Sequence, residues 1–126
     1  MVFEGTKVIA LEQAVAAPLC TRRLAQKGAE VIKIERETGD FARHYDSAVK
    51  GQSAYFVWLN GGKKSVVLNL KDEQHKATLA SLVESADILV QNLKPGTLSK
   101  LGFDLNDWHS NNPRLISCSI SGFAPD

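Results

Sequence analysis

Cysteine is scarce in this sequence. Its 126 residues include two cysteines, Cys20 and Cys118, which lie far apart in the chain. Neither has the closely spaced partner that a metal site or a redox motif requires. The pattern therefore predicts reduced thiols and a cytoplasmic protein.

The sequence also lacks an excess of charge of either sign. Fifteen basic and fourteen acidic residues leave a net charge of +1. A chain with this balance has no overall field that would attract nucleic acid or an anionic membrane. Any bound anion must therefore be held by a local cluster of cations.

Long hydrophobic runs are absent. No apolar stretch approaches the roughly 20 residues that a membrane-spanning helix needs. The N-terminal segment carries Glu4 and Lys7 near its start and has no apolar core followed by a cleavage site, so it does not resemble a signal peptide. With 44% hydrophobic and 23% charged residues, the composition is typical of a globular domain without a membrane partner.

Three glycine-rich signatures are missing as well. There is no GxGxxG after the first apolar run, no GxxxxGK[ST] and no GxSxG. Their absence argues against a dinucleotide site, a P-loop and a hydrolase nucleophile elbow. His44, His75 and His109 have no partner at metal-ligand spacing, and Cys20 has no histidine near it in sequence. The residues alone identify no catalytic group and no metal site.

Short apolar runs alternate with helical segments along the chain. The runs lack strict polar alternation, as expected for strands that are covered on both faces. This order is typical of βαβ units and predicts an α/β fold with a parallel sheet. Strands are expected at residues 7–11, 31–34, 65–70, 87–90 and 115–120, helices at 14–27, 53–59, 72–86, 97–101 and 105–109, and a loop with a short helical piece at 38–51.

The expected strands end in polar and often cationic residues. In an open parallel sheet, ligands bind beyond the carboxyl ends of the strands. Small residues after the first strand lead into a helix N-terminus, where free N–H groups favour anions. The pattern predicts a ligand with several phosphates. The cations concerned are Arg36, Lys71 and Lys94, with Lys63, Lys64 and Lys100 nearby.

A structural explanation competes with this functional one at each single position. Strand ends are polar in many α/β proteins because they leave the core, and surface ion pairs are common. Glu35, for example, is accounted for by a pairing with a lysine. The set of strand ends taken together is more informative than any one member.

Four segments resemble, in order, the N-terminal portion of the family III CoA-transferases, the CaiB/BaiF group that includes formyl-CoA transferase. These segments are residues 8–43, 53–71, 86–104 and 112–123. The resemblance implies a Rossmann-like parallel sheet with flanking helices. It also implies that residues 1–126 are an incomplete N-terminal part of the large domain, and that the full-length protein is an interlocked homodimer.

The resemblance implies an activity too. The family moves CoA between an acyl-CoA donor and a carboxylic acid acceptor through covalent catalysis by an aspartate carboxylate. Coenzyme A or acyl-CoA is then a substrate, and no tightly bound cofactor is expected. The family's aspartate falls after residue 126, so no catalytic residue is assigned here. Residues 39–46 and 51–60 resemble members that act on small dicarboxylates such as mesaconate, itaconate, citramalate or succinate.

The resemblance assigns CoA contacts to nine residues, which fall on or near the strand ends. Three of them follow the first expected strand, and one follows the second. Two lie around the end of the third strand and two after the fourth, and the last is a cation in the short helix that comes next. These residues are Gln13, Ala14, Val15, Arg36, Leu68, Lys71, Asn92, Leu93 and Lys100.

The chain departs from the family pattern at some of these positions. Gln13 stands where histidine is frequent, Leu93 where an aromatic residue is usual, and Lys100 where arginine is common. A lysine keeps the charge but loses the bidentate geometry toward a phosphate. In the turn at residues 60–63, Gly61 stands where the family often has arginine, so one cation is lost.

Two alternatives to a transferase remain open at this level. One is an acyl-CoA racemase of the same superfamily, whose acid and base would also fall after residue 126. The other is a truncated protein that binds CoA or a partner chain without catalysis, or a remnant without activity. An uncovered fifth strand with an unpaired edge predicts poor solubility for an isolated monomer.

Overall fold

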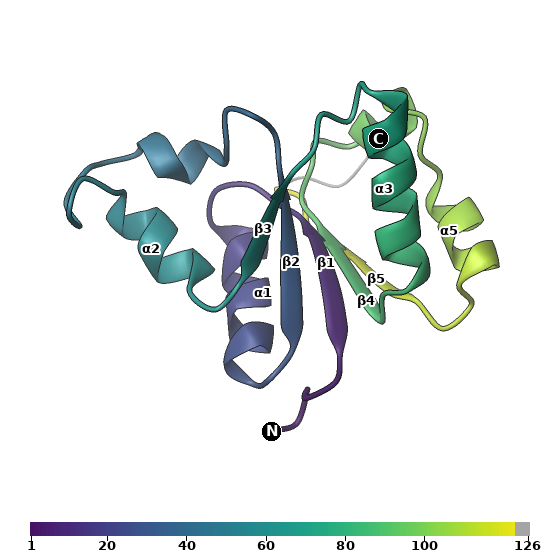
Figure 1. Ribbon diagram of the computed structural model, residues 1–126, viewed down its shortest axis with the longest axis horizontal. Helices are drawn as coiled ribbons and strands as arrows, with labels where there is room; N and C mark the ends of the chain where they lie inside the picture. The colour runs from purple at the N-terminus through teal and green to yellow at the C-terminus, as the bar shows by residue number, and fades with distance from the viewer. Residues whose placement is uncertain (123–126) are drawn as a thin grey trace.

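A five-stranded parallel sheet forms the centre of the protein. The structure, a computed structural model, describes residues 1–122. The strand order is β3-β2-β1-β4-β5, so the chain winds outward from β1 in both directions (Figure 1). This order confirms the expected Rossmann-like α/β fold, and it places a topological switch point between β1 and β4. The strands are β1 (Lys7–Leu11), β2 (Glu30–Glu35), β3 (Lys64–Val67), β4 (Ile88–Gln91) and β5 (Ile116–Ser119).

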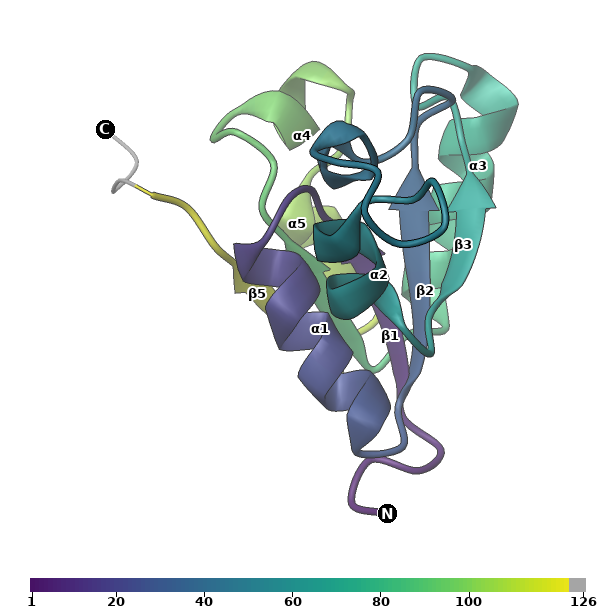
Figure 2. The same cartoon turned by 90° about the vertical axis from the view of Figure 1, so that its left-hand side faces the viewer.

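Helices cover both faces of the sheet. One face carries α1 and α2, and the opposite face carries α3 and α5 (Figures 1 and 2). None of the helices within residues 1–122 is long and apolar enough to cross a membrane. The helices are α1 (Ala16–Gln26), α2 (Ala54–Asn60), α3 (Glu73–Glu84), α4 (Thr97–Lys100) and α5 (Leu105–Asn111), and a 3₁₀ helix spans Phe41–His44.

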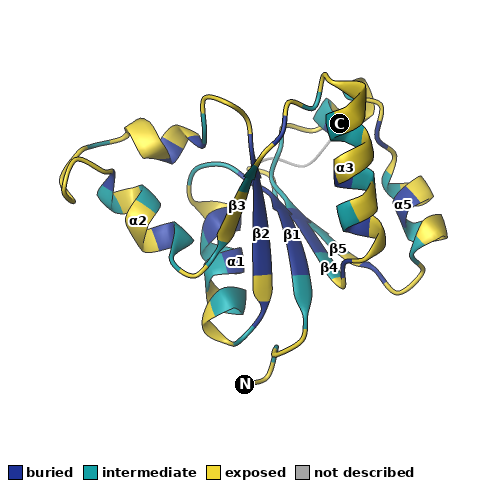
Figure 3. Ribbon diagram, in the orientation of Figure 1, coloured by how far each residue is buried: buried dark blue, intermediate teal, exposed yellow. Residues whose placement is uncertain are grey.

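The alternation of side chains along β1 divides the core into two layers. Val8 and Ala10 pack toward α1, whereas Ile9 and Leu11 pack toward α3. All four are almost fully buried, as the central strands in Figure 3 show. Each buried side chain of the size of valine or isoleucine contributes about 1.5–3 kcal/mol. The two layers together hold the central strands in place, and the positions of the residues at the ends of these strands follow from that.

Several expected boundaries differ from the observed ones, most of them by one or two residues. The helix expected from residue 14 begins at Ala16, because Ala14 has a left-handed φ of +64°. The strand expected to reach residue 70 ends at Val67, because its partner β2 ends at Glu35. The helix expected to reach residue 86 ends at Glu84. The helix expected at residues 53–59 is confirmed, with Ser53 as its N-cap.

Candidate functional site

A cleft of about 770 Å³ opens at the carboxyl ends of the strands. Its walls come from the segments that follow β1 to β4, together with α4. The volume lies within the range of small-molecule and cofactor sites. Six of the nine predicted contact residues line this cleft: Gln13, Arg36, Leu68, Lys71, Asn92 and Leu93.

The other three predicted residues do not line the cleft. Ala14 and Val15 lie in the loop that leads from the cleft into α1. Lys100 is an exposed residue at the end of α4, whose Thr97 borders the cleft. The CoA contacts assigned to all nine residues stay predictions.

Two loops of the cleft are joined by side-chain amides. The Asn92 Oδ1 accepts a hydrogen bond from the Gln13 N–H at 2.8 Å, and its Nδ2 donates to the Gln13 carbonyl at 2.9 Å. The Gln13 Oε1 in turn accepts from the Phe41 N–H at 3.1 Å. These side chains therefore hold the walls of the cleft together, beside any contact they make with a ligand.

The cations at the cleft have different surroundings. The Arg36 guanidinium lies 4.2 Å from the centre of the Phe41 ring, so a cation–π contact orients it along the cleft wall. Lys71 and Lys94 are exposed, and within residues 1–122 neither forms an ion pair. Both amines are therefore available to an anionic ligand.

The interpretation of Lys63 and Lys64 as cations beside this ligand is wrong. The Lys63 side chain is only 2% exposed, and its Nζ donates to Glu12 Oε1 at 2.7 Å. Burial lowers the pKa of Lys63 to about 8, although the Glu12 carboxylate opposes this shift. Lys64 is the first residue of β3, so it lies at the amino-terminal end of the strands, away from the cleft, and pairs there with Glu30 at 3.1 Å.

The expectation for Glu35 also needs a correction. Its partner is Arg43 rather than a lysine, with two hydrogen bonds of 2.9 and 2.8 Å. Burial alone would raise the pKa of Glu35, but the hydrogen bonds from Arg43 and Ser65 outweigh it and lower the pKa to about 2. Glu35 therefore stabilises the wall behind Arg36.

A buried cluster of charged side chains lies beneath the cleft, and the sequence reasoning missed it. Glu12, Lys33 and Asp40 are each at most 1% exposed. The Lys33 Nζ donates to Asp40 Oδ2 at 2.7 Å and to Glu12 Oε1 at 3.3 Å. One signal for it was present in the sequence, because Lys33 interrupts the apolar run of β2 between two buried isoleucines.

The loop that carries Lys71 is held by a histidine. The His75 Nδ1 accepts a hydrogen bond from the Asn69 N–H at 2.7 Å, and the Asn69 Oδ1 accepts from the Lys71 N–H at 3.1 Å. Within residues 1–122, no group of three or more His, Cys, Asp or Glu side chains could hold a metal ion. The chemistry that these residues offer is the binding of an anionic ligand.

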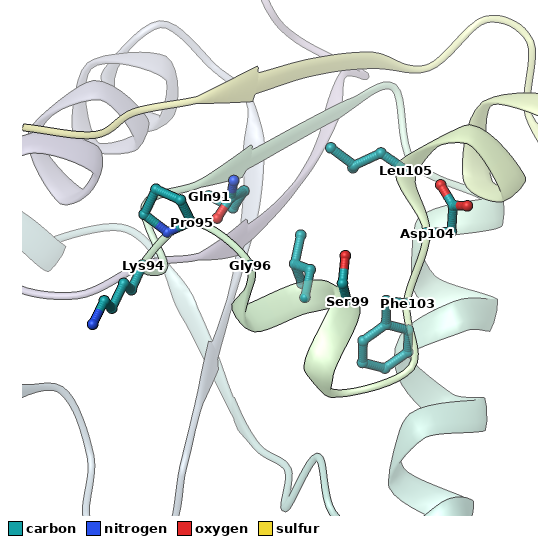
Figure 4. A pocket seen from close by; sticks show the side chains of 9 residues that line it. Gln91, Lys94, Pro95, Gly96, Ser99, Phe103, Asp104 and Leu105 are labelled. Carbon is teal, nitrogen blue, oxygen red and sulfur yellow. The ribbon is translucent and has the colours of Figure 1, made fainter. Parts of the chain in front are cut away.

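A smaller hollow of about 250 Å³ lies next to the cleft (Figure 4). It is lined by residues from the end of β4, from α4 and from the start of α5, and Lys94 borders both cavities. On the side of β4, the Gln91 Oε1 accepts from the Leu93 N–H at 2.9 Å. Both hollows therefore border the segment between β4 and α4.

Comparisons with known proteins identify relatives of this chain. The sequence matches CoA-transferase family III over residues 3–126. It is 44% identical to an acetyl-CoA:oxalate CoA-transferase of Acetobacter aceti over 122 residues, which are 96% of this chain and 31% of the relative. It is 40% identical to a formyl-CoA:oxalate CoA-transferase of Rhodopseudomonas palustris (strain HaA2), over 98% of this chain and 29% of the relative.

Solved structures give the same result. A CAIB/BAIF family protein from Brucella suis has a TM-score of 0.89 and 37% identity, over 95% of this chain and 33% of that chain. A hypothetical protein from Mycobacterium tuberculosis has a TM-score of 0.89 and 37% identity, over 97% of this chain and 34% of that chain. The chain spans about a third of the length of the proteins it matches. Its sequence and fold together show that the chain belongs to CoA-transferase family III.

Proposed function

We propose that this chain binds the CoA portion of an acyl-CoA for transfer of CoA to a carboxylic acid. One observation carries this proposal: six residues that the family resemblance assigns to CoA lie around a single cleft at the carboxyl ends of the strands. Arg36 and Lys71 supply positive charge for the phosphates. Leu68 and Leu93 supply apolar surface for the pantetheine arm.

The proposed reaction proceeds through the carboxylate of an aspartate that lies outside this chain's residues. The carboxylate attacks the thioester carbonyl of the acyl-CoA, a mixed anhydride forms and CoA leaves as the thiolate. The thiolate then attacks the anhydride at the aspartyl carbonyl and releases the donor acid. The acceptor carboxylate then attacks the aspartyl thioester, so that a second mixed anhydride forms and CoA leaves as the thiolate. The thiolate attacks the acceptor's carbonyl in this anhydride, which gives the new acyl-CoA and frees the aspartate carboxylate. This chain's part is to hold the CoA while both acids exchange, within an interlocked homodimer of the full-length protein.

Oxalate is the first acceptor that we propose, as the smallest member of the small dicarboxylates. Two relatives at 44% and 40% identity are named as transferases that act on oxalate. A protein that carries this chain together with the rest of the family's large domain should convert acetyl-CoA and oxalate into oxalyl-CoA and acetate. Chromatographic detection of oxalyl-CoA, and of the products with other small dicarboxylates, ranks the acceptors.

Titration calorimetry of the protein with CoA tests the binding step directly. Lys71→Ala should raise the Kd for CoA roughly tenfold, because a charge-assisted contact to phosphate is lost. Lys27→Ala is the matched control, since it removes an exposed lysine at the end of α1, away from the cleft. Absence of CoA binding, or an equal effect of the two substitutions, contradicts the proposal.

A further inference from the structure

The charged side chains beneath the cleft form one closed and neutral cluster. Two carboxylates, Glu12 and Asp40, face two amines, Lys33 and Lys63, and Asn60 accepts from both amines at 2.9 and 3.0 Å. Within residues 1–122, no buried side-chain nitrogen or oxygen lacks a partner. Every charge in the cluster is therefore compensated without a ligand.

Asp40 links this cluster to the two loops that carry the cleft. Its Oδ2 accepts from Lys33 Nζ at 2.7 Å, while its Oδ1 accepts from the Ala14 N–H at 2.8 Å and the Ala42 N–H at 2.9 Å. Ala42 lies in the 3₁₀ helix that begins with Phe41, on which Arg36 stacks. One carboxylate thus fixes the loop after β1 and the turn after β2.

The conformation of Ala14 shows why this carboxylate matters. Ala14 has a φ of +64°, in the left-handed region that disfavours residues with a Cβ atom. Such a conformation persists only where the surroundings hold it. Asp40 holds its N–H from one side, and Asn92 holds the neighbouring Gln13 main chain from the other. The loop that follows β1 is therefore clamped between these two side chains.

A buried ion pair is a poor device for stability alone. Desolvation of two charges offsets most of their attraction, and apolar residues of similar size would often serve as well. A charged acceptor does, however, fix the direction of main-chain donors more strongly than a neutral one. The position of Lys33 and Asp40 against two cleft loops points to a geometric role.

We propose that Asp40, neutralised by the buried Lys33, is a positioning residue of the CoA cleft. It fixes the amides of Ala14 and Ala42 and so sets the positions of Gln13 and Phe41. The effect of Asp40 on CoA binding rests on the proposed function. The structural half of the inference, that Asp40 fixes the loop after β1, is independent of any ligand.

Amide hydrogen exchange tests the structural half without CoA. Asp40→Ala should accelerate exchange at Ala14 and Ala42 at least about tenfold, because both donors lose their acceptor. Val83→Ala is the matched control: it opens a cavity under α3, on the other face of the sheet, and lowers stability without touching these loops. Equal acceleration in both variants, or unchanged exchange at Ala14, overturns the positioning role.

The CoA affinity tests the consequence. Asp40→Ala should raise the Kd roughly tenfold, whereas Val83→Ala should leave it unchanged at a temperature where both are folded. Ala14→Gly should reduce the loss in the Asp40→Ala background, because glycine adopts a positive φ without support. A loss that Ala14→Gly does not reduce shows that Asp40 acts only through global stability, and it overturns the proposal.

A second variant covers the case in which Asp40→Ala does not fold. Ala14→Val leaves the ion pair and the core intact, but a β-branched residue disfavours a positive φ more strongly than alanine. It should accelerate hydrogen exchange at its own amide, and this readout does not depend on the CoA contact predicted for Ala14. Unchanged exchange in this variant contradicts the proposal. If the wild-type protein binds no CoA, the proposed function fails, while the exchange experiment still decides the positioning role.

Discussion

Glu35 shows how a single residue links the cleft wall to stability. Its pKa of about 2 in the folded protein lies below the ordinary value of 4.5. The ion pair with Arg43 therefore contributes stability that is complete above pH 4.5 and is lost as the pH falls to about 2. Because the Arg43 side chain is 39% exposed, screening limits the contribution to about 2 kcal/mol.

Glu35→Gln should accordingly lower the free energy of unfolding by about 2 kcal/mol at pH 7 and by much less at pH 2. Urea denaturation followed by circular dichroism at both pH values measures the two differences. Val83→Ala is the control, because a cavity without a charge should cost the same at both pH values. If Glu35→Gln lowered the free energy of unfolding equally at both pH values, the charge of the carboxylate would not contribute to the stability of the cleft wall.

The cations show where sequence reasoning reaches its limit at the scale of residues. Lys63 and Lys71 both follow segments that lead out of the core, and both were expected near the anionic ligand. Lys71 lines the cleft, whereas Lys63 is buried against Glu12. The sequence gives the type of each residue, but the choice between solvent and a carboxylate 51 positions away depends on the fold of the whole chain.

At the scale of elements, α3 depends on its N-terminal cap. The Asp72 Oδ1 accepts from the Gln74 N–H at 2.8 Å and from the His75 N–H at 3.2 Å. Asp72→Ala should lower the free energy of unfolding by about 1 kcal/mol, because two main-chain donors lose their acceptor. Asp72→Ser, which keeps a capping oxygen, should cost only a few tenths of that value.

Chemical denaturation of the two variants checks this prediction. The result also bears on the cleft, since His75 in the first turn of α3 holds the loop that carries Lys71. Equal losses for alanine and serine would show that the cap oxygen contributes nothing and that another contact fixes the helix start.

The ends of β3 show why element boundaries were harder to predict than the elements themselves. The apolar run continues through Leu68 and Leu70, so composition favours a longer strand. The last ladder bond runs from the Leu68 N–H to the Glu35 carbonyl at 2.9 Å, and β2 offers no further partner. A strand ends where its neighbour ends, which is a property of the pair. Leu68 and Asn69 turn into the cleft for this reason.

At the scale of the whole molecule, the sequence predicted the location of the cleft from one rule. Alternating strands and helices indicated a parallel sheet, and a parallel sheet directs ligands to its carboxyl edge. Six of the nine residues assigned by resemblance lie around the cleft found there. The buried cluster around Lys33 was not predicted. A lysine within an apolar run implies that an acidic partner is buried with it, but the sequence does not show which residue that partner is.

Exposed apolar residues at the sheet edges lead to a prediction for the molecule as a whole. β3 and β5 are the edge strands, and Ile116 on β5 is 64% exposed. Edge strands with exposed apolar side chains pair readily with other chains. A second exposed apolar patch lies on and near α2, where Tyr45, Tyr55 and Trp58 form a row of ring contacts. Two surfaces therefore compete as the site of self-association.

The 126-residue chain should associate increasingly with concentration, and Ile116→Lys should reduce this association, because a charge at the edge opposes strand pairing. Val57→Lys is the matched control: it places the same charge on α2 at a valine that is 41% exposed. Light scattering coupled to size-exclusion chromatography, over a range of protein concentrations, gives the mass of each variant. A decrease with Ile116→Lys alone assigns the association to the β5 edge. A decrease with Val57→Lys alone contradicts the edge argument and assigns the association to the exposed surface of α2.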